Sequence, residues 1–277
     1  DFKNTHMYSC AVNPIAGRET QLDMLIPKNY KTQNVAIIGG GPAGMKTAIL
    51  AAERGHTVTL FEKQDVLGGQ LNDADFMAFK YDLRKYKNYL IDHVMKHEKI
   101  TVKLGTEATP EAIKAMGFDS VVCAIGAEPL IPSIPGVDGS NVIWAGDSFY
   151  QPQAVGNDIV VIGGGQVGCE TAIHYGTNGK KVTILEMKSA LARDAMRTYR
   201  EEIEGQVHDH CEAIVDAQVT MIEADGVTYK DAEGATHKVP CDTVILAVGM
   251  KSLRAEAEAF RDCAENFSKG IVSKLVM

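Results

Sequence analysis

The sequence predicts an α/β fold of two Rossmann-like domains, the second inserted in the first. Its 277 residues contain one stretch twice: VAIIGGGPAGMKTAILAAERGHTVTLFEK at residues 35–63 and IVVIGGGQVGCETAIHYGTNGKKVTILEM at residues 159–187. Twelve of the 29 aligned positions are identical. An apolar run that ends in glycine also recurs, as DSVVCAIG at residues 119–126 and DTVILAVG at residues 242–249. The chain therefore carries the same α/β unit in two copies.

The first copy has the pattern of a strand, a helix and a second strand. Residues 35–38 are a short apolar run that ends at glycine, which is typical of a buried parallel strand. Apolar residues at helical spacing then predict a helix over 42–54, with Pro42 in its first turn and Gly55 at its C-terminal end. The stretch TVTLFE at residues 57–62 predicts the next strand.

The rest of the chain is arranged around a second unit of this kind, which starts at Ile159. Residues 82–97 predict a longer amphipathic helix, and Thr109 followed by proline predicts the cap of a short one. Residues 214–239 hold short alternating segments with turns between them, which predicts an antiparallel meander. We expect the proline- and glycine-rich segment 131–139 to carry the chain from one domain to the other.

Each copy has the spacing Gly-x-Gly-x-x-Gly after a strand and at the start of a helix, with a glutamate at the end of the next strand. In such a turn the first glycine allows the bend, the second lets the backbone approach a pyrophosphate, and the third lets helix and strand pack closely. The helix N-terminus offers free N–H groups to the phosphates, and the carboxylate accepts the ribose hydroxyls. The two copies therefore predict two dinucleotide-binding domains of the FAD/NAD(P)-binding type.

The residues that follow the two copies differ. LGGQL at residues 67–71 follows the first copy, and its glycine pair lets the chain curl around a long dinucleotide, so we expect FAD in the first site. KSALARD at residues 188–194 has no glycine, and we expect NAD(H) in the second site. Glu186 favours a free 2′-hydroxyl and no arginine follows it, which favours NADH over NADPH. Lys188 is interpreted as a solvated surface residue.

Candidate cofactor-binding residues follow from these motifs and from the two strands that end in glycine. They are Gly39, Gly41, Pro42, Ala43, Gly44, Glu62, Lys63, Gly68, Gly69, Gln70, Ala124, Gly126, Gly163, Gly165, Gln166, Val167, Gly168, Glu186 and Gly249. We name no catalytic side chain, because a flavin and a nicotinamide carry the hydride transfer and the protein holds them.

Composition restricts the kinds of protein that this chain can be. The net charge is −8, from 28 Lys+Arg and 36 Asp+Glu, and an acidic surface without a basic run argues against nucleic-acid binding. No stretch of about 18 consecutive apolar residues is present, so we expect no membrane-spanning helix. No signal peptide is visible, and the scattered cysteines fit neither a disulfide framework nor a zinc site, which favours a reduced, cytoplasmic setting.

A few polar residues outside the motifs also need an interpretation. His208, His210 and Cys211 lie in the stretch HDHC without a fourth ligand, which favours a solvated loop over a metal site. His174 is expected to be a packing or surface residue. Cys123 lies in an apolar run, and we expect it to be a small core residue.

The combination of motifs resembles the two-dinucleotide-binding flavoproteins, and more narrowly the C-terminal half of enzymes that join an old-yellow-enzyme-type barrel to such a module. This NADH:flavin oxidoreductase family includes 2,4-dienoyl-CoA reductase, trimethylamine dehydrogenase and enoate reductases. The resemblance lies in the segments CAVNPIAGRE, VAIIGGGPAGM, LGGQL, VVCAIGAEPLIPSIPG, VVIGGGQVGCETA and DTVILAVG. It implies that NAD(P)H reduces FAD, and that electrons then pass through an iron–sulfur cluster to FMN in the barrel and to an enoyl-type or amine substrate.

The sequence departs from this family pattern twice. Cys10 matches the last of four cluster cysteines, so the resemblance implies a 4Fe-4S ligand only if the other three stand upstream in the full-length protein. The family's last flavin motif, a Gly-Asp before a final helix, is expected after Phe267, where the chain reads SKGIVSKLVM instead. Gly146 and Asp147 form the same pair, but at a position where the family has an ordinary loop.

These observations predict an N-terminal arm over 1–33, an FAD-binding domain over 34–148 and 251–277 without its last strand and helix, and an NAD(H)-binding domain over 149–250. The expected function is that of the flavin and pyridine-nucleotide module of an NAD(P)H-dependent oxidoreductase, partnered by a missing FMN barrel domain or subunit. The formation of a homo-oligomer stays open. The alternatives are a non-catalytic nucleotide-binding fragment and a disulfide-reductase-like flavoprotein, which the absence of a CxxC pair disfavours.

Overall fold

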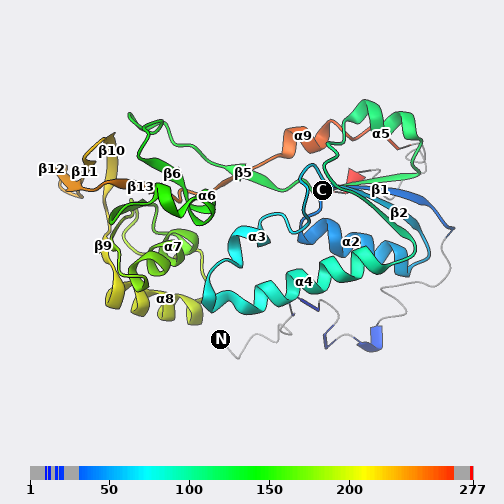
Figure 1. The fold of residues 1–277 in the computed structure, drawn as a ribbon, viewed down its shortest axis with the longest axis horizontal. Coiled ribbons are helices and arrows are strands. Elements are labelled where there is room, and N and C mark those ends of the chain that lie inside the picture. The colour runs from blue at the N-terminus through cyan, green and yellow to red at the C-terminus, as the bar shows by residue number, and fades with distance from the viewer. Residues whose placement is uncertain are drawn as a thin grey trace. The chain divides into compact units, whose positions relative to one another are not determined.

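The structure of the protein, a computed structural model, divides the chain into two compact units (Figure 1). Unit 1 comprises residues 1–126 and 253–277, and unit 2 comprises residues 127–252, so the second unit is inserted in the first as predicted. The structure describes residues 10, 12, 13, 16, 17, 19–21, 31–264 and 275–276.

Unit 1 is built on a parallel sheet that has, in the described residues, five strands in the order β15-β4-β1-β2-β3. The strands are β1 (Asn34–Ile38), β2 (Thr57–Phe61), β3 (Ile100–Lys103), β4 (Ser120–Cys123) and β15 (Leu275–Val276). The helices are η1 (Glu19–Gln21), α2 (Pro42–Glu53), α3 (Leu71–Ala74), η2 (Ala78–Lys80), α4 (Tyr81–Lys96), α5 (Pro110–Met116) and α9 (Arg254–Glu258).

Both faces of this sheet are buried, which explains the continuous apolar run of β1. Side chains alternate along a strand, so Val35 and Ile37 pack in one cluster with residues of α2 and α4. Ala36 and Ile38 pack on the opposite face, in a cluster that includes Ile113 of α5 and residues of α9 and the turn after it. A parallel strand covered by helices on both sides has no solvent-facing positions to fill with polar residues.

Unit 2 repeats this plan and adds an antiparallel part. In the described residues its main sheet is parallel in the order β6-β13-β7-β8-β9, beside a β10-β11-β12 meander and a β14-β5 pair. The strands are β5 (Ala127–Pro129), β6 (Val142–Trp144), β7 (Asp158–Ile162), β8 (Lys181–Leu185), β9 (Glu212–Ile214), β10 (Gln218–Glu223), β11 (Gly226–Lys230), β12 (Thr236–Pro240), β13 (Thr243–Leu246) and β14 (Met250–Ser252). The helices are α6 (Ala145–Tyr150), η3 (Pro152–Ala154), α7 (Gln166–Thr177) and α8 (Arg197–His210).

The meander covers one face of the main sheet of unit 2. Val160 and Ile162 of β7 share a buried cluster with Ile222, Val227 and Tyr229 of the meander. Helix α7 packs against β7 and β8 and against α8. The antiparallel meander predicted over 214–239 is confirmed, and it takes the place that helices α5 and α9 have in unit 1.

The predicted helices of unit 1 are confirmed, together with their end signals. Pro42 begins α2, and Gly55 follows its end with a φ of +95°. The hydroxyl of Thr109 accepts a hydrogen bond from the N–H of Ala112 at 3.2 Å, which is the predicted cap of α5. Helix α4 covers the predicted amphipathic segment. No helix in the described part of the chain is long and apolar enough to cross a membrane.

Some expectations about local structure differ from what is observed. The first crossing between the units comes after Gly126, earlier than the predicted boundary at residue 148. The reason is that β6 pairs with β13, a contact across about a hundred residues that the sequence pattern does not display. The segment with Gly146 and Asp147 forms α6, at a position where the resemblance implies an ordinary loop.

Two further corrections concern chain segments near the ends of helices and sheets. His208 and His210 were expected in a solvated loop, but they lie in the last turn of α8, where their side chains are exposed. The last strand of unit 1 was expected to be absent, but Leu275 and Val276 form β15 beside β4. The residues expected to hold the last flavin motif, directly after Phe267, lie outside the described residues.

Candidate functional site

The glycine-rich turns of the two units have the same backbone geometry. Gly39 in unit 1 has a φ of +105°, and its counterpart Gly163 in unit 2 has a φ of +103°. A side chain is strained in this region, so only glycine turns the chain here without cost. Each glycine N–H donates to the carbonyl of the neighbouring strand, Gly39 to Phe61 at 2.8 Å and Gly163 to Leu185 at 2.9 Å.

The third glycine of each motif lets the helix lie directly on the turn. A Cβ atom on Gly44 would overlap the carbonyl oxygen of Gly39, and one on Gly168 would overlap that of Gly163. Ala124 of unit 1 adjoins the same contact, since a Cβ atom on Gly44 would lie 3.5 Å from the Cβ of Ala124. The predicted role of these glycines in close helix–strand packing is therefore visible in both units.

The glutamate after the second strand of each motif binds the turn itself. In unit 1 the Oε2 of Glu62 accepts from the N–H of Gly40 at 2.7 Å, and its Oε1 accepts from the N–H of Gln64 at 2.8 Å. In unit 2 the Oε2 of Glu186 accepts from Gly164 at 2.6 Å, while its Oε1 accepts from Lys188 at 2.8 Å. The spacing predicted a ribose ligand at these positions and did not predict this second task.

Both glutamates are buried. Glu62 is 8% exposed and Glu186 is 7% exposed. A buried carboxylate is tolerated when hydrogen bonds satisfy it, and two backbone N–H donors do so in each unit. The two carboxylates are therefore held in place beside the glycine turn before any nucleotide arrives.

The segments that follow the glutamates take the same course despite their different sequences. In unit 1 the N–H of Gly68 donates to the carbonyl of Gly40 at 3.0 Å, and in unit 2 the N–H of Ala192 donates to that of Gly164 at 2.7 Å. Ala192 adopts a positive φ of 44°, which alanine rarely does. The repeat therefore extends past the aligned stretch of 29 residues to residue 194, which corresponds to Gln70.

The N-termini of the two helices have different surroundings. In unit 1 a Cβ atom on Gly69 would lie 2.9 Å from the Cα of Gly41, so the backbone of the glycine pair runs against the turn. In unit 2 the N–H of Gln166 donates to the Oδ1 of Asp194 at 2.8 Å. Asp194 was missed by sequence reasoning, and the repeat alignment carried beyond Glu186 is the signal that places it there.

The remaining candidate residues line the same turns or the crossings between units. Pro42, Ala43 and Val167 belong to the first turns of α2 and α7, and Lys63 follows β2. Gly126 and Gly249 have φ values of +74° and +114° at the ends of units 1 and 2. The carbonyl of Gly126 accepts from Leu253 at 3.1 Å, and that of Gly249 accepts from Leu130 at 3.0 Å.

Helix α7 also carries a buried acidic residue that the motif analysis did not single out. Glu170 is 1% exposed, and its Oε1 accepts from the hydroxyl of Tyr199 at 2.7 Å and from the side-chain amide of Gln166 at 3.1 Å. Burial raises the pKa of Tyr199, and Glu170 raises it further. An acidic residue on an otherwise apolar helix face was the available signal. These contacts fix the side chain of Gln166 along the helix.

Four cysteines in the described part of the chain have raised pKa values because they are buried or partly buried. Burial raises the pKa of Cys123 and of Cys169 to about 12. Burial also raises the pKa of Cys211 and of Cys241 to about 11. A thiolate is the reactive form of cysteine, so none of these four is suited to attack a disulfide near neutral pH. The expected core role of Cys123 is confirmed.

The candidate metal ligands of the sequence do not gather into one group in the described part of the chain. No group of three or more His, Cys, Asp or Glu residues there could hold a metal ion. Cys10 is exposed, and the three further cysteines that a cluster would need are not part of this sequence upstream of it. His208 lies beside Asp209, with its Nδ1 3.2 Å from the carboxylate.

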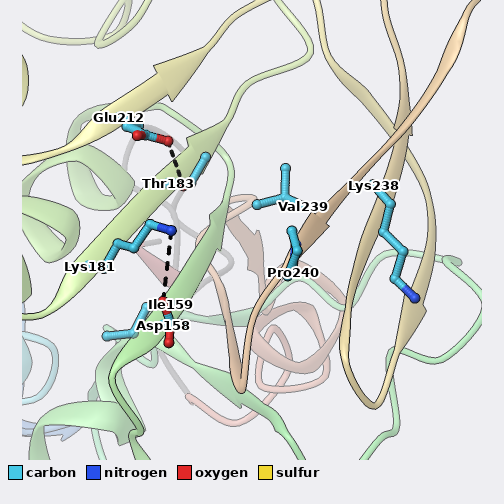
Figure 2. A pocket seen from close by; sticks show the side chains of 8 residues that line it. All are labelled: Asp158, Ile159, Lys181, Thr183, Glu212, Lys238, Val239 and Pro240. Carbon is cyan, nitrogen blue, oxygen red and sulfur yellow. Dashed lines mark hydrogen bonds and ion pairs between the residues drawn. The ribbon is translucent and has the colours of Figure 1, made fainter.

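A separate cavity lies at the amino ends of the parallel strands of unit 2, away from the glycine turn. Figure 2 shows Asp158, Lys181 and Glu212 at the starts of β7, β8 and β9, opposite Lys238 on β12. Lys181 pairs with Asp158 at 3.9 Å, and Glu212 accepts weakly from Thr183 at 3.5 Å. The glycine turn follows the carboxyl end of β7, so this cavity lies at the opposite end of the strand from the turn.

Comparison with known proteins agrees with this geometry. Residues 33–261 match the pyridine nucleotide-disulphide oxidoreductase family. The chain is 36% identical to an NADH oxidase of Thermoanaerobacter brockii, over 92% of the chain and 40% of that protein. It is 34% identical to a bilirubin reductase of Mediterraneibacter gnavus, over 94% of the chain and 40% of that protein.

A solved structure of a 2-naphthoyl-CoA reductase superposes with a TM-score of 0.85 at 32% identity, over 92% of this chain and 39% of that one. The chain thus spans about two fifths of the length of the relatives that it matches. The similarity to the NADH oxidase and to the 2-naphthoyl-CoA reductase agrees with the resemblance predicted from the motifs. The chain belongs to the pyridine nucleotide-disulphide oxidoreductase family.

Proposed function

We propose that this chain is the module that passes a hydride from NADH to FAD, with FAD held by unit 1 and NADH by unit 2. The observation that carries the proposal is the pair of unequal sites. Both units have the same glycine turn and the same buried glutamate, but only unit 1 has a glycine pair running against the turn. A doubled scaffold with one unused site would not need the same buried glutamate on both of its turns.

The residues of unit 1 fit the extended dinucleotide FAD. The turn Gly39–Gly44 would take the pyrophosphate at the N-terminus of α2, and Glu62 would take the adenosine ribose. A Cβ atom on Gly69 would come within 2.9 Å of Gly41, so the cradle beside the turn exists only because glycine is there. This close approach supports FAD, rather than NADH, in unit 1.

The residues of unit 2 fit NADH. Glu186 would accept the 2′- and 3′-hydroxyls of the adenosine ribose, and a 2′-phosphate there would meet a buried negative charge. The sequence after Glu186 continues with Met187 and Lys188, and Lys188 directs its backbone N–H at the carboxylate. The site therefore favours NADH over NADPH.

The two bound groups supply the hydride chemistry, in which the nicotinamide donates and the flavin accepts. The chain's own contribution is binding and orientation by the two turns, and no acid–base side chain is required. The disulfide-reductase alternative is disfavoured because the sequence has no CxxC pair and the buried thiols are protonated.

The relatives are more than twice as long as this chain, so we propose a partner domain or subunit. By the family resemblance it would hold FMN in a barrel and receive electrons through a 4Fe-4S cluster that uses Cys10. The final substrate would bind in that barrel, and the enoyl-type or amine class proposed for it comes from the resemblance alone.

A visible spectrum tests the proposal. The purified chain, reconstituted with FAD and freed of excess, should show the bands of oxidised flavin, and anaerobic NADH should bleach them. NADPH should bleach them more slowly at equal concentration. A chain that binds neither FAD nor NADH would instead support the non-catalytic fragment.

A further inference from the structure

The N-terminus of α7 holds a negative side chain where a nucleotide pyrophosphate is expected. The Oδ1 of Asp194 accepts from the N–H of Gln166, the first residue of the helix, at 2.8 Å. Both carboxylate oxygens also lie close to the turn, since a Cβ atom on Gly165 would be 3.4 and 3.5 Å from them. Asp194 is exposed, so its carboxylate has room to move into solvent.

The backbone N–H of Gln166 is well placed to bind an anion. The first N–H groups of a helix have no partner within the helix, and the helix dipole gives that end a partial positive charge. Helix α7 is 12 residues long and begins directly after the glycine turn. A pyrophosphate and the Asp194 carboxylate are therefore alternative anions for the same end of the helix.

In unit 1 the position that corresponds to Asp194 carries no carboxylate, so the two helix starts can be compared. Its helix α2 begins with Pro42, which has no N–H, and the residue at the place of Asp194 is the neutral Gln70. Among the described residues, only the Cα of Gly69 comes within 4 Å of a Cβ atom built on Gly41. Within one duplicated motif, the donor and the carboxylate are present together in unit 2 and absent together in unit 1.

We infer that Asp194 weakens nucleotide binding in unit 2, because its carboxylate competes with the pyrophosphate for the start of α7. The inference rests on the proposed function, in which unit 2 takes NADH. This competition would give NADH in unit 2 a shorter bound lifetime than FAD in unit 1. NADH must bind and NAD⁺ must leave in every turnover, whereas FAD stays in unit 1. A carboxylate that competes with the pyrophosphate therefore suits the site in unit 2 and would not suit the site in unit 1.

The test is a binding titration of the chain with NADH, with ADP-ribose and with adenosine. Asp194→Asn keeps an oxygen that can accept from Gln166 but removes the charge, so the turn is preserved. We expect its Kd for NADH and for ADP-ribose to fall by about two- to fivefold, the range that one charge at a helix end typically contributes. The Kd for adenosine, which has no phosphate, should not change.

Three further measurements make the result decisive. Asp194→Ser, a shorter neutral acceptor, should tighten NADH binding in the same direction. Asp209→Asn makes the same change in net charge on an exposed position of α8 and should leave the Kd unchanged. The gain in Asp194→Asn should shrink as salt rises from low to about 0.5 M, because ions screen the repulsion that the substitution removes.

The outcomes separate this inference from the proposed function. If wild type binds NADH and Asp194→Asn binds it equally or more weakly, the role of Asp194 is wrong while the NADH site stands. If adenosine gains as much as ADP-ribose, the effect does not come from the pyrophosphate, and the inference is again wrong. If neither wild type nor variant binds NADH or ADP-ribose, the proposed function itself fails.

Discussion

Two glutamates stabilise the glycine turns of this protein, and we propose that they also bind the nucleotides. Glu62 and Glu186 each join the end of a strand to the middle glycine of the turn and to the backbone two residues later. Their carboxylates remain nearly buried with these bonds made. A carboxylate that is already fixed loses little conformational freedom when it binds a ribose. The hydrogen bonds that stabilise the turn therefore also hold the carboxylate in position for a nucleotide.

Glu186→Gln should weaken both the turn of unit 2 and the binding of NADH. The amide oxygen can accept from one backbone N–H, but the NH₂ group then faces the other donor, so one buried N–H loses its partner. We expect the free energy of unfolding in urea to fall by about 1–3 kcal/mol, with weaker NADH binding. Glu201→Gln, at an exposed position of α8, is the matched control and should unfold like wild type. An unchanged unfolding midpoint in Glu186→Gln would contradict the structural role.

His174 should give unit 2 a dependence on pH. It packs edge-on to Phe149 with ring centroids 5.4 Å apart, and burial lowers its pKa below the ordinary value of 6.5. The unfolded chain therefore takes up the proton first as pH falls. Stability should be at its full value above pH 6.5 and should decline below it, through the lowered pKa of the folded state.

Urea unfolding at pH 7.5 and at lower pH measures this decline. His174→Gln should show a smaller loss of stability between the two conditions than wild type. His210→Gln, on the exposed end of α8, serves as the control and should keep the wild-type dependence. A pH dependence that is the same in all three proteins would rule out His174 as its source.

At the scale of elements, the strand–turn–helix unit is repeated in its contacts and not only in its sequence. In both units the helix lies so close to the turn that its third glycine has no space for a side chain. The covering of the sheet differs, because helices α5 and α9 pack in unit 1 where the meander packs in unit 2. The strand–turn–helix unit is therefore alike in the two units, while the elements that cover the sheet differ.

Two glycine-to-alanine substitutions in unit 2 should have opposite effects. Gly168→Ala places a Cβ atom on the carbonyl of Gly163 and should destabilise unit 2 by about 1–3 kcal/mol while weakening NADH binding. Gly205→Ala lies in the exposed face of α8, where nothing stands within 4 Å, and should stabilise by up to about 1 kcal/mol. Thermal unfolding measures both. Equal shifts of the same sign would show that close packing at Gly168 is not required.

At the scale of the whole molecule, two compact units with one turn each imply that each ligand should protect its own unit. Hydrogen exchange read by mass spectrometry should show slower exchange around residues 39–44 and 62–69 with FAD. NADH should slow exchange around residues 163–168 and 186–194. At 100 times its Kd a ligand adds about 2.7 kcal/mol to the stability of the state that binds it. Protection of unit 2 by FAD would reverse the assignment of the sites.

Much of the fold could be predicted because its signals are local. The strand runs, the glycine spacing, the Thr109 cap and the meander turns each depend on a few neighbouring residues. The segment 188–194 was interpreted as unlike its counterpart because it lacks glycine, yet it follows the same course through the strained Ala192. The first domain boundary was misplaced because β6 finds its partner about a hundred residues away.

The sequence by itself determined that the chain has two α/β units, where their glycine turns and glutamates stand, and that the second unit is inserted in the first. These features depend on the period of apolar residues and on the backbone freedom of glycine, both of which are properties of short segments. Only the tertiary structure decided what each carboxylate touches: Glu62 and Glu186 on the turns, and Asp194 on the start of α7. Those contacts join residues 22 to 28 positions apart, and chain packing rather than local preference brings them together.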